Sequence, residues 1–389
     1  MTEYRYYKRV RARVFLSLMS VMGLALAAES PSDPAPALLP MDLRWTSPVP
    51  LGATASLVVG DTRLFAVRSS QVTSYAWADG EVLWESPLTV SAPPVAAEGH
   101  VFLVGEDRLE SLSEVSGYVE WRLPTGPVTI APTVHAGWVM VTNADGLLRA
   151  VSAADGRVVW TTQLPVALAA PLTIDANLVV AAFQDGTVTA WRITDGVVQW
   201  SRILGTRPDQ VLAAHGRVYL TDDDRRLVSL RQRDGHQEWA YPVGVPSVGR
   251  LTVDADHIYL ATIDNSVRIY NRNGHQHRRM ALAFRIVDGM VADGQRLFVP
   301  QSNGEIRIYL ADGTRAGRLL PPSPNAIVLN GLVRSGTGPH LRMAMTLSED
   351  STLTISTYSR SGLTATAAVS APATLLPPQT WPPRPPGRH

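Results

Sequence analysis

The stretch AVSAADGRVVW, from Ala150 to Trp160, contains the turn dipeptide Asp155-Gly156, and a tryptophan follows the glycine four residues later. The same spacing of a glycine and a tryptophan occurs five times in the chain. A fixed period of tens of residues is the signature of a repeat protein, in which each repeat is one supersecondary unit. The turn glycines of the five copies lie 37 to 40 residues apart: Gly80, Gly117, Gly156, Gly196 and Gly235. The tryptophans that follow them are Trp84, Trp121, Trp160, Trp200 and Trp239.

The phase of the repeat continues beyond the last of these tryptophans. Gly274 and Gly313 follow at steps of 39 residues, in the sequences YNRNG and YLADG. Gly362 follows in YSRSG after a longer step of 49 residues. The chain of 389 residues therefore holds eight units, which is enough to bury a large core.

The unit at 135–160 has the pattern of a series of short strands. Two apolar runs in it, Trp138–Val141 and Leu147–Val151, are separated by an Asp-Gly pair, and a second Asp-Gly pair precedes the final tryptophan. Apolar runs between Asp-Gly turns are typical of antiparallel hairpins. A further strand is expected at about 131–134, because a step of 39 residues leaves room for four strands. Repetition of such units predicts an all-β fold, an eight-bladed β-propeller of four-stranded antiparallel blades.

The repeated glycine and tryptophan are interpreted as structural residues. A propeller widens with distance from its axis, so a large ring on an outer strand can fill the wedge between adjacent blades. Burial of such a ring contributes about 2 to 3 kcal/mol. The glycine supplies the positive φ angle that a tight hairpin turn requires. Three tryptophans outside the repeat position are expected to pack in the core as well: Trp77, Trp138 and Trp191. Trp77 and Trp191 share a phase near the second turn, and exposure as contact residues is the alternative for these two.

Closure of the ring is assigned to a strand that precedes the first complete unit. The stretch LRWTSPV, Leu43–Val49, matches the tryptophan end of a unit, and Trp45 lies 39 residues before Trp84. Because an open ring would leave an unpaired strand edge, we expect this N-terminal strand to complete the eighth blade. The other strands of that blade are expected at 326–333, 341–346 and 352–358. The stretch 363–369 is a second candidate for the closing strand, and the sequence leaves the choice open.

The N-terminal residues have the pattern of a secretory signal peptide: basic residues from Arg5 to Arg13, then an apolar run from Val14 to Ala27 that ends in small residues. We expect residues 1–28 to be removed on export, residues 29–41 to form a linker and residues 42–370 to form the propeller. Residues 371–389 are rich in proline and are expected to be a disordered tail. Without residues 1–28 the chain has 30 basic and 33 acidic residues, a net charge of −3, which argues against nucleic acid as a partner.

No arrangement of residues in the sequence predicts a catalytic, cofactor-binding or metal site. The chain contains no cysteine, which excludes a disulfide, a thiolate metal site and a cysteine nucleophile. Six histidines occupy equivalent phases of different units, so we expect them in solvent-exposed turns, apart from one another. They are His100, His135, His215, His257, His236 and His275. The run Asp222–Asp224 has the phase of a hairpin turn and is expected to be solvated, so that such turns give one rim an acidic patch for a basic partner.

The repeated form, an alanine and an aliphatic residue followed by an Asp-Gly or Ser-Gly turn and a tryptophan, resembles the tryptophan-docking repeat of quinoprotein propellers. One branch with this repeat is the PQQ-dependent alcohol dehydrogenases, which are much longer, hold PQQ with calcium in a central funnel and commonly carry a vicinal disulfide. This chain has no cysteine and no long insertion that would cap a cofactor. The other branch is the family of the outer-membrane protein assembly factor BamB. The sequence resembles that family over about residues 42–369, in size, in its eight units and in the N-terminal tryptophan strand.

Resemblance to the BamB family implies a non-catalytic periplasmic scaffold that assists the assembly and insertion of outer-membrane β-barrel proteins. The implied partners are a POTRA domain of the barrel-assembly subunit BamA and unfolded outer-membrane proteins, contacted through loops between neighbouring blades. The corresponding loops are 163–171 and 204–210. From them we predict the partner-binding residues Leu164, Val166, Leu168, Leu204, Arg207 and Asp209.

The sequence departs from the family at the expected anchor. BamB proteins are usually lipoproteins anchored through a cysteine after the signal peptide, whereas this region reads LALAAES and the chain has no cysteine. The resemblance therefore implies a monomer within a complex, held near the outer membrane by its partners. Two alternatives stay open: a small PQQ-binding quinoprotein with dye-linked dehydrogenase activity, and a propeller that serves another envelope complex.

Overall fold

The computed structural model describes residues 41–49, 56–68, 70–128, 130–287, 289–294, 296–336, 340–349 and 352–360. The predicted signal peptide, the linker up to residue 40, the alternative closing strand at 363–369 and the proline-rich tail lie outside these residues. In the described part of the chain, no helix has the length and apolar character needed to cross a membrane.

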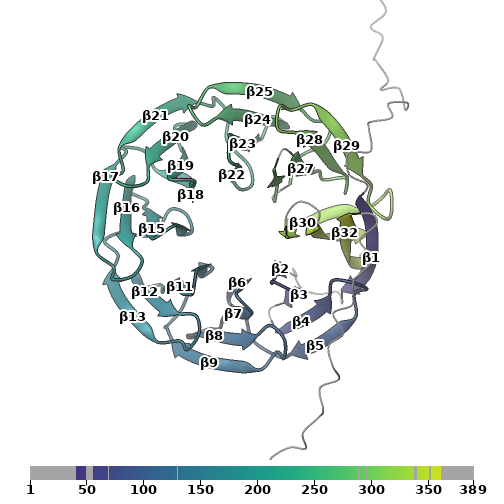
Figure 1. Ribbon diagram of the computed structural model, residues 1–389, viewed down its shortest axis with the longest axis horizontal. Helices are drawn as coiled ribbons and strands as arrows, with labels where there is room; N and C mark the ends of the chain where they lie inside the picture. Colours follow the sequence, from purple (N-terminus) through teal and green to yellow (C-terminus); the bar gives the residue numbers. More distant parts are fainter. Residues whose placement is uncertain are drawn as a thin grey trace, which may run out of the picture. The chain divides into compact units, whose positions relative to one another are not determined.

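Eight four-stranded antiparallel sheets form the blades of a ring around a central axis (Figure 1). In blades 1 to 7 the chain enters at the inner strand beside the axis and leaves from the outer strand on the rim. This arrangement confirms the eight-bladed propeller that the repeat predicts.

The first four blades follow one another along the chain. Blade 1 consists of β2 (Ser56–Val59), β3 (Arg63–Arg68), β4 (Gln71–Ala76) and β5 (Val82–Ser86). Blade 2 consists of β6 (Ala92–Ala97), β7 (His100–Val104), β8 (Arg108–Ser113) and β9 (Val119–Pro124). Blade 3 consists of β10 (Thr133–His135), β11 (Trp138–Thr142), β12 (Leu147–Ser152) and β13 (Val158–Gln163). Blade 4 consists of β14 (Thr173–Asp175), β15 (Leu178–Ala182), β16 (Thr187–Arg192) and β17 (Val198–Ile203).

The last four blades complete the ring. Blade 5 consists of β18 (Pro208–Ala214), β19 (Arg217–Asp222), β20 (Arg226–Arg231) and β21 (Gln237–Pro242). Blade 6 consists of β22 (Thr252–Val253), β23 (His257–Thr262), β24 (Ser266–Asn271) and β25 (Gln276–Ala281). Blade 7 consists of β26 (Val291–Asp293), β27 (Arg296–Pro300), β28 (Ile306–Leu310) and β29 (Arg315–Leu319). Blade 8 consists of β30 (Ile327–Ser335), β31 (Arg342–Glu349), β32 (Thr352–Arg360) and β1 (Met41–Val49).

The hydrophobic core lies in the eight seams between neighbouring blades. Each seam contains one cluster of buried apolar side chains, drawn from the facing sheets of two adjacent blades. A middle strand is therefore covered on both faces, and β15 is a continuous apolar run in which every residue is buried. A single blade has no partner for either face, so the blades are stable only as a stack.

The tryptophans of the repeat join each blade to the next one. The indole of Trp160 on β13 lies flat against Gly196 in blade 4, and its Nε1–H donates to the backbone oxygen of Ile193 at 2.6 Å. In all six pairs a Cβ on the glycine would lie only 2.5–2.8 Å from a ring atom of the preceding blade. The indole N–H groups donate to backbone oxygens at 2.6–3.0 Å. The docked pairs are Trp45–Gly80, Trp84–Gly117, Trp121–Gly156, Trp160–Gly196, Trp200–Gly235 and Trp239–Gly274.

The docking residue changes in blades 6 and 7. Arg278 occupies the tryptophan position of β25, lies against Gly313 and donates from Nη1 to the oxygen of Asp312 at 3.1 Å. In β29 the position is Gly317, which has no side chain. The residue opposite the docking position changes with it: it is serine or alanine in blades 1 to 5, but Ile269 faces Arg278 and Ile308 faces Gly317. The larger aliphatic side chain thus fills space that the indole vacates.

The N-terminal strand closes the ring, as predicted. β1 pairs antiparallel with β32 and takes the outer position of blade 8, with Trp45 opposite Thr357. From there the Trp45 indole docks on blade 1 and donates to the oxygen of Trp77 at 3.0 Å. The strands expected at 326–333, 341–346 and 352–358 are β30, β31 and β32. Trp77 and Trp191 are buried and Trp138 is half-buried in a seam, which confirms packing for the tryptophans outside the repeat position.

Two glycine variants separate the docking contact from the turn conformation. Gly196 and Gly216 both have positive φ angles, of 70° and 77°, but only Gly196 has an indole within reach of an added Cβ. We expect Gly216→Ala to lower the free energy of unfolding by about 1–2 kcal/mol, the cost of the left-handed conformation. Gly196→Ala should lower it by a further 1–3 kcal/mol, roughly, because the Trp160 ring must move. Urea unfolding monitored by circular dichroism measures both, and equal losses would contradict the docking contact.

Candidate functional site

Two kinds of connection lie together on one face of the ring. In an antiparallel blade the turn between the second and third strands lies at the same end as the link from the outer strand to the next blade. We call this end the loop face, and around blades 3 to 5 it consists of the links 164–172 and 204–207 with the turns 183–186 and 223–225. The second link is shorter than predicted, because β18 begins at Pro208 and places Asp209 in a strand.

The apolar residues predicted to bind a partner anchor these links to the core. Leu164 is only 5% exposed and packs in the seam between blades 3 and 4, where Val166 and Leu168 are half-buried against the same cluster. Leu204 is half-buried in the following seam. The outward surface of the first link is therefore made by its alternate residues, Pro165 and Ala167, which are exposed.

Hydrogen bonds hold both links against the neighbouring turns. In the first link, the Ala169 amide donates to Ala182 and the oxygen of Ala167 accepts from Gln184 at 3.0 Å. In the second link, the Leu204 amide donates to Gly186 at 2.9 Å. A surface that is already ordered loses little conformational entropy when a partner binds. The loop face of blades 3 to 5 is therefore a preorganised surface.

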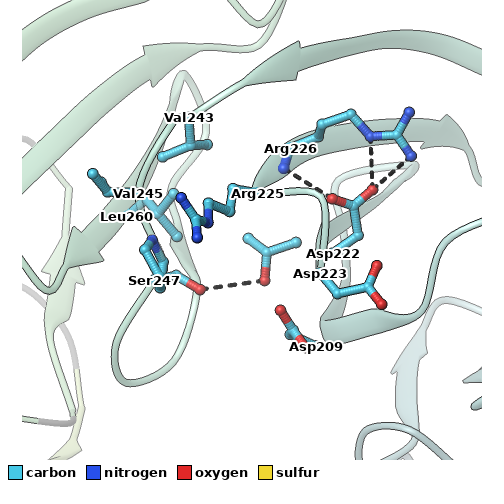
Figure 2. A pocket seen from close by; sticks show the side chains of 11 residues that line it. Asp209, Asp222, Asp223, Arg225, Arg226, Val243, Val245, Ser247 and Leu260 are labelled. Carbon is cyan, nitrogen blue, oxygen red and sulfur yellow. Dashed lines mark hydrogen bonds and ion pairs between the residues drawn. The ribbon is translucent and has the colours of Figure 1, made fainter.

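A pocket of about 240 Å³ opens on the loop face between blades 5 and 6 (Figure 2). Its three aspartates lie on one side, and Val243, Val245 and Leu260 form an aliphatic wall on the other. The lining residues are Asp209, Thr221, Asp222, Asp223, Arg225, Arg226, Val243, Val245, Pro246, Ser247 and Leu260.

Asp222 is a structural residue of this pocket, which corrects the prediction that the whole run Asp222–Asp224 is solvated. It is 2% exposed, and Oδ1 accepts from the backbone amide of Arg226 while Oδ2 accepts from the Arg226 Nε, both at 2.9 Å. The Thr206 hydroxyl donates to the same Oδ2 at 3.0 Å. The carboxylate is buried because the second link of the loop face lies over it and supplies this donor.

The exposed carboxylates of the pocket belong to Asp209 and Asp223. Asp223 Oδ1 accepts from the Arg207 amide at 3.1 Å, and the Arg207 guanidinium lies 3.5 Å from Asp209 Oδ1. Partial burial raises the pKa of the Asp209 carboxyl, the carboxylates of Asp223 and Asp222 raise it further, and Arg207 opposes them. The neighbouring carboxylates make this site favour an added positive charge. The chemistry of the pocket therefore suits a basic side chain with an aliphatic stem.

The structure brings together two of the predicted residues, Arg207 and Asp209, and adds others that the sequence did not single out. Arg225, with a φ of 58°, and Ser247 belong to the pocket, as does the aliphatic wall from the link after blade 5. The Arg-Arg pair that follows the three aspartates was the available signal for Arg225. No pattern in the sequence marks the residues of that link, because their role depends on the neighbouring blade.

The six histidines do not form a common site, although two of them are less exposed than predicted. His100 and His257 have side chains that are 21% exposed, and His100 Nδ1 lies 2.5 Å from Glu120 Oε2. His135, His215, His236 and His275 lie in exposed turns or at strand ends beside them, as predicted. Over the described ranges, no group of three or more histidine and acidic residues is arranged to hold a metal ion.

The ring of blades joined by docked tryptophans defines the class of this protein, an eight-bladed β-propeller with PQQ-like repeats. Within that class, the chain belongs to the outer membrane protein assembly factor BamB family, whose model matches residues 42–127, 68–214 and 210–320.

Individual relatives are distant. Outer membrane protein assembly factor BamB of Yersinia pestis is 27% identical over 183 residues, which are 42% of this chain and 46% of that protein. The chain spans about half the length of the curated BamB relatives it matches. The crystal structure of BamB from Moraxella catarrhalis covers 80% of this chain and 99% of its own, with a TM-score of 0.61 and 16% identity.

An enzyme shares the same architecture. Quinohemoprotein alcohol dehydrogenase ADHIIG from Pseudomonas putida HK5 covers 89% of this chain and 79% of its own, with a TM-score of 0.62 and 13% identity. Similarity at such identities shows the fold, and one fold can serve different functions.

Neighbouring aspartates should respond differently to removal. We expect Asp222→Ala to lower the free energy of unfolding by about 2–4 kcal/mol, because Arg226 and Thr206 lose a buried acceptor. Asp223→Ala, at an exposed site, should lower it by less than about 1 kcal/mol. Thermal unfolding of the two variants in parallel measures this, and similar midpoints would show that Asp222 is not a structural carboxylate.

Proposed function

We propose that this protein is a non-catalytic periplasmic scaffold that assists the assembly and insertion of outer-membrane β-barrel proteins through protein–protein contacts. Membership of the BamB family supports this role. The single structural observation that carries it is the preorganised loop face, where rigid links frame an acidic pocket with an aliphatic wall. Such a surface suits recognition of a folded partner without a reaction centre.

The proposed partner is a POTRA domain of the barrel-assembly subunit BamA, with unfolded outer-membrane proteins as the cargo of the complex. Two of the exposed polar groups of the loop face are the Arg207 guanidinium, 51% exposed, and the Asp209 carboxylate, 42% exposed. We assign them to polar contacts, with a basic side chain of the partner in the pocket beside Asp209. The leucines and valine of the links support the surface from below.

The proposed location is the periplasmic side of the outer membrane. The sequence has no cysteine that could carry a lipid. Membrane association is therefore proposed to occur through the partner subunits, with this chain as one monomer in the complex.

Charge removal at the pocket should weaken the complex. We expect the double variant Asp209→Asn/Asp223→Asn to bind a purified tandem-POTRA fragment of the same organism's barrel-assembly subunit about tenfold more weakly than the parent chain, as measured by calorimetry. Asp155→Asn, an exposed aspartate in a turn on the opposite face, is the matched control and should bind normally. Failure of the parent chain to bind the fragment at all would remove the proposed partner.

The same complex should depend on pH in a defined direction. The pKa of Asp209 is raised, so this carboxyl gains a proton at a higher pH than an ordinary aspartate does. Protonation removes the negative charge that a basic partner group requires, so affinity should fall as the pH is lowered from neutral through the range in which this carboxyl gains its proton, which begins at a higher pH than for an ordinary aspartate. The fall should be smaller in Asp209→Asn, which has no carboxyl to titrate there. An unchanged pH profile in that variant would show that Asp209 is outside the contact.

The quinoprotein alternative has an independent test. Addition of PQQ and calcium to the purified chain should produce neither the absorbance of bound cofactor nor dye-linked alcohol oxidation if the protein is a scaffold. Saturable cofactor absorbance together with turnover would replace the proposed function with an enzymatic one.

A further inference from the structure

The inner strands of the ring enclose a second and larger cavity. It has a volume of about 770 Å³ and is lined by strands of six blades, among them β2, β6, β22 and β30, which border the axis in Figure 1. The lining is more apolar than polar, and its partly exposed aliphatic side chains include Val95, Leu212, Val253 and Val333. We call this cavity the central channel. Its volume falls within the range of about 300–1,000 Å³ that is typical of sites for small organic ligands.

A further cavity of about 500 Å³ continues the channel at the end away from the loop face. The two cavities share the lining residues Val59, Ala96 and Arg334, so they are adjacent. This second part is bounded by Gly60 and Asp61 after β2, by Ser335 and Gly336 at the end of β30, and by His340 and Arg342 at the start of β31. We call it the channel mouth.

Two guanidinium groups lie at the channel mouth, and one of them, that of Arg334, already lies 3.9 Å from the carboxylate of Asp293. Two arginines and a histidine line it, Arg334, Arg342 and His340, against one carboxylate, Asp61. Oδ2 of Asp61 accepts a hydrogen bond from the Gly99 amide at 3.0 Å, so this oxygen is already bonded to blade 2. Within the described part of the chain, the exposed Arg342 has neither an ion pair nor a hydrogen bond from its side chain.

Arg334 connects the charged mouth to the aliphatic channel. Its Nη1 donates to the oxygen of Ala292 at 3.1 Å and lies 3.9 Å from the buried carboxylate of Asp293, while the side chain stays 44% exposed. These contacts hold the guanidinium at the boundary between the two cavities. Arg250 lines the opposite end of the channel, beside the loop face, and this residue already has an interaction partner in the protein.

We infer that the central channel binds an amphiphilic organic anion with a single extended apolar chain. The aliphatic walls would cover the apolar chain, and the anionic group would lie between Arg334 and Arg342 at the mouth. A concave site with a largely apolar lining and a few convergent polar groups is the usual form of a small-molecule site. Guanidinium groups bind carboxylates with two parallel hydrogen bonds, which favours an anion over a neutral head group. The charged mouth of this site lies at the end opposite the loop face, and the inference does not depend on the proposed partner.

Calorimetry with palmitate as the probe tests this inference. The parent chain should bind one palmitate, and Arg342→Gln should bind it about tenfold more weakly, because one charge-assisted contact is lost. Val95→Glu, which places a negative charge on a half-exposed position of the channel wall, should weaken binding at least as much. The matched control is Arg157→Gln, an exposed arginine of a turn in blade 3, which should bind like the parent. Neither Arg342 nor Val95 is fully buried, so both variants are expected to fold.

Results of three kinds would overturn the inference. The first is no binding of palmitate to the parent chain, or equal binding to the parent and both channel variants. The second is inorganic phosphate binding as tightly as palmitate, because the apolar channel would then contribute nothing. The third is a protein that binds phosphatidylglycerol vesicles but not monomeric palmitate, with vesicle binding unchanged in Val95→Glu. This result would place the lipid contact on an outer surface of the protein. Slower amide exchange in β2, β6 and β30 on addition of palmitate would support the channel.

Discussion

The contact between an indole ring and a glycine without a side chain sets the geometry of the whole ring. Each of the six docked tryptophans covers the glycine of the next blade and donates its N–H to a backbone oxygen there. The glycine is required twice, for its positive φ and for the space that a Cβ would take from the ring. Because the same contact recurs in successive seams, neighbouring blades keep one relative position. The pocket between blades 5 and 6 and the central channel both depend on that spacing.

The ring tolerates a change in this contact where other residues change with it. Arg278 keeps the hydrogen bond to the next blade without an indole. The residue opposite it on the neighbouring strand is Ile269, which is larger than the serine or alanine at this position in blades 1 to 5. At Gly317 the docking side chain is gone, and the adjoining seam holds a large apolar cluster that includes Met41 on the closing strand. Directional docking and non-directional apolar burial thus both contribute to the seams, in different proportions around the ring.

Local signals account for the parts of the structure that could be predicted. The number of blades and the turns follow from spacing, because every unit repeats the same hairpin pattern, whereas the spacing of Trp45 favoured the N-terminal closing strand without excluding 363–369. The docking partner of each tryptophan was not evident, since it lies in the following unit and becomes a neighbour only in the ring. Burial of Asp222 likewise depends on Thr206, and the pocket wall depends on Val245, residues from links that carry no periodic pattern. Contacts between blades therefore cannot be predicted from the sequence of a single unit.

Closure by the N-terminal strand has a consequence for the order of folding. β1 is the first strand of the propeller to be synthesised, yet its hydrogen-bonded neighbour β32 is among the last, and Trp45 and Thr357 are 312 residues apart. Trp45 reaches its docking glycine, Gly80, across only a short stretch of chain, so it can hold β1 beside blade 1 long before β32 exists. Until β32 is synthesised and paired, β1 has no hydrogen-bonded neighbour and leaves an unpaired strand edge in the incomplete ring. The pairing of β1 with β32 joins the strands that are farthest apart in the sequence. Chains in which this pairing has not yet formed are those most exposed to misassociation.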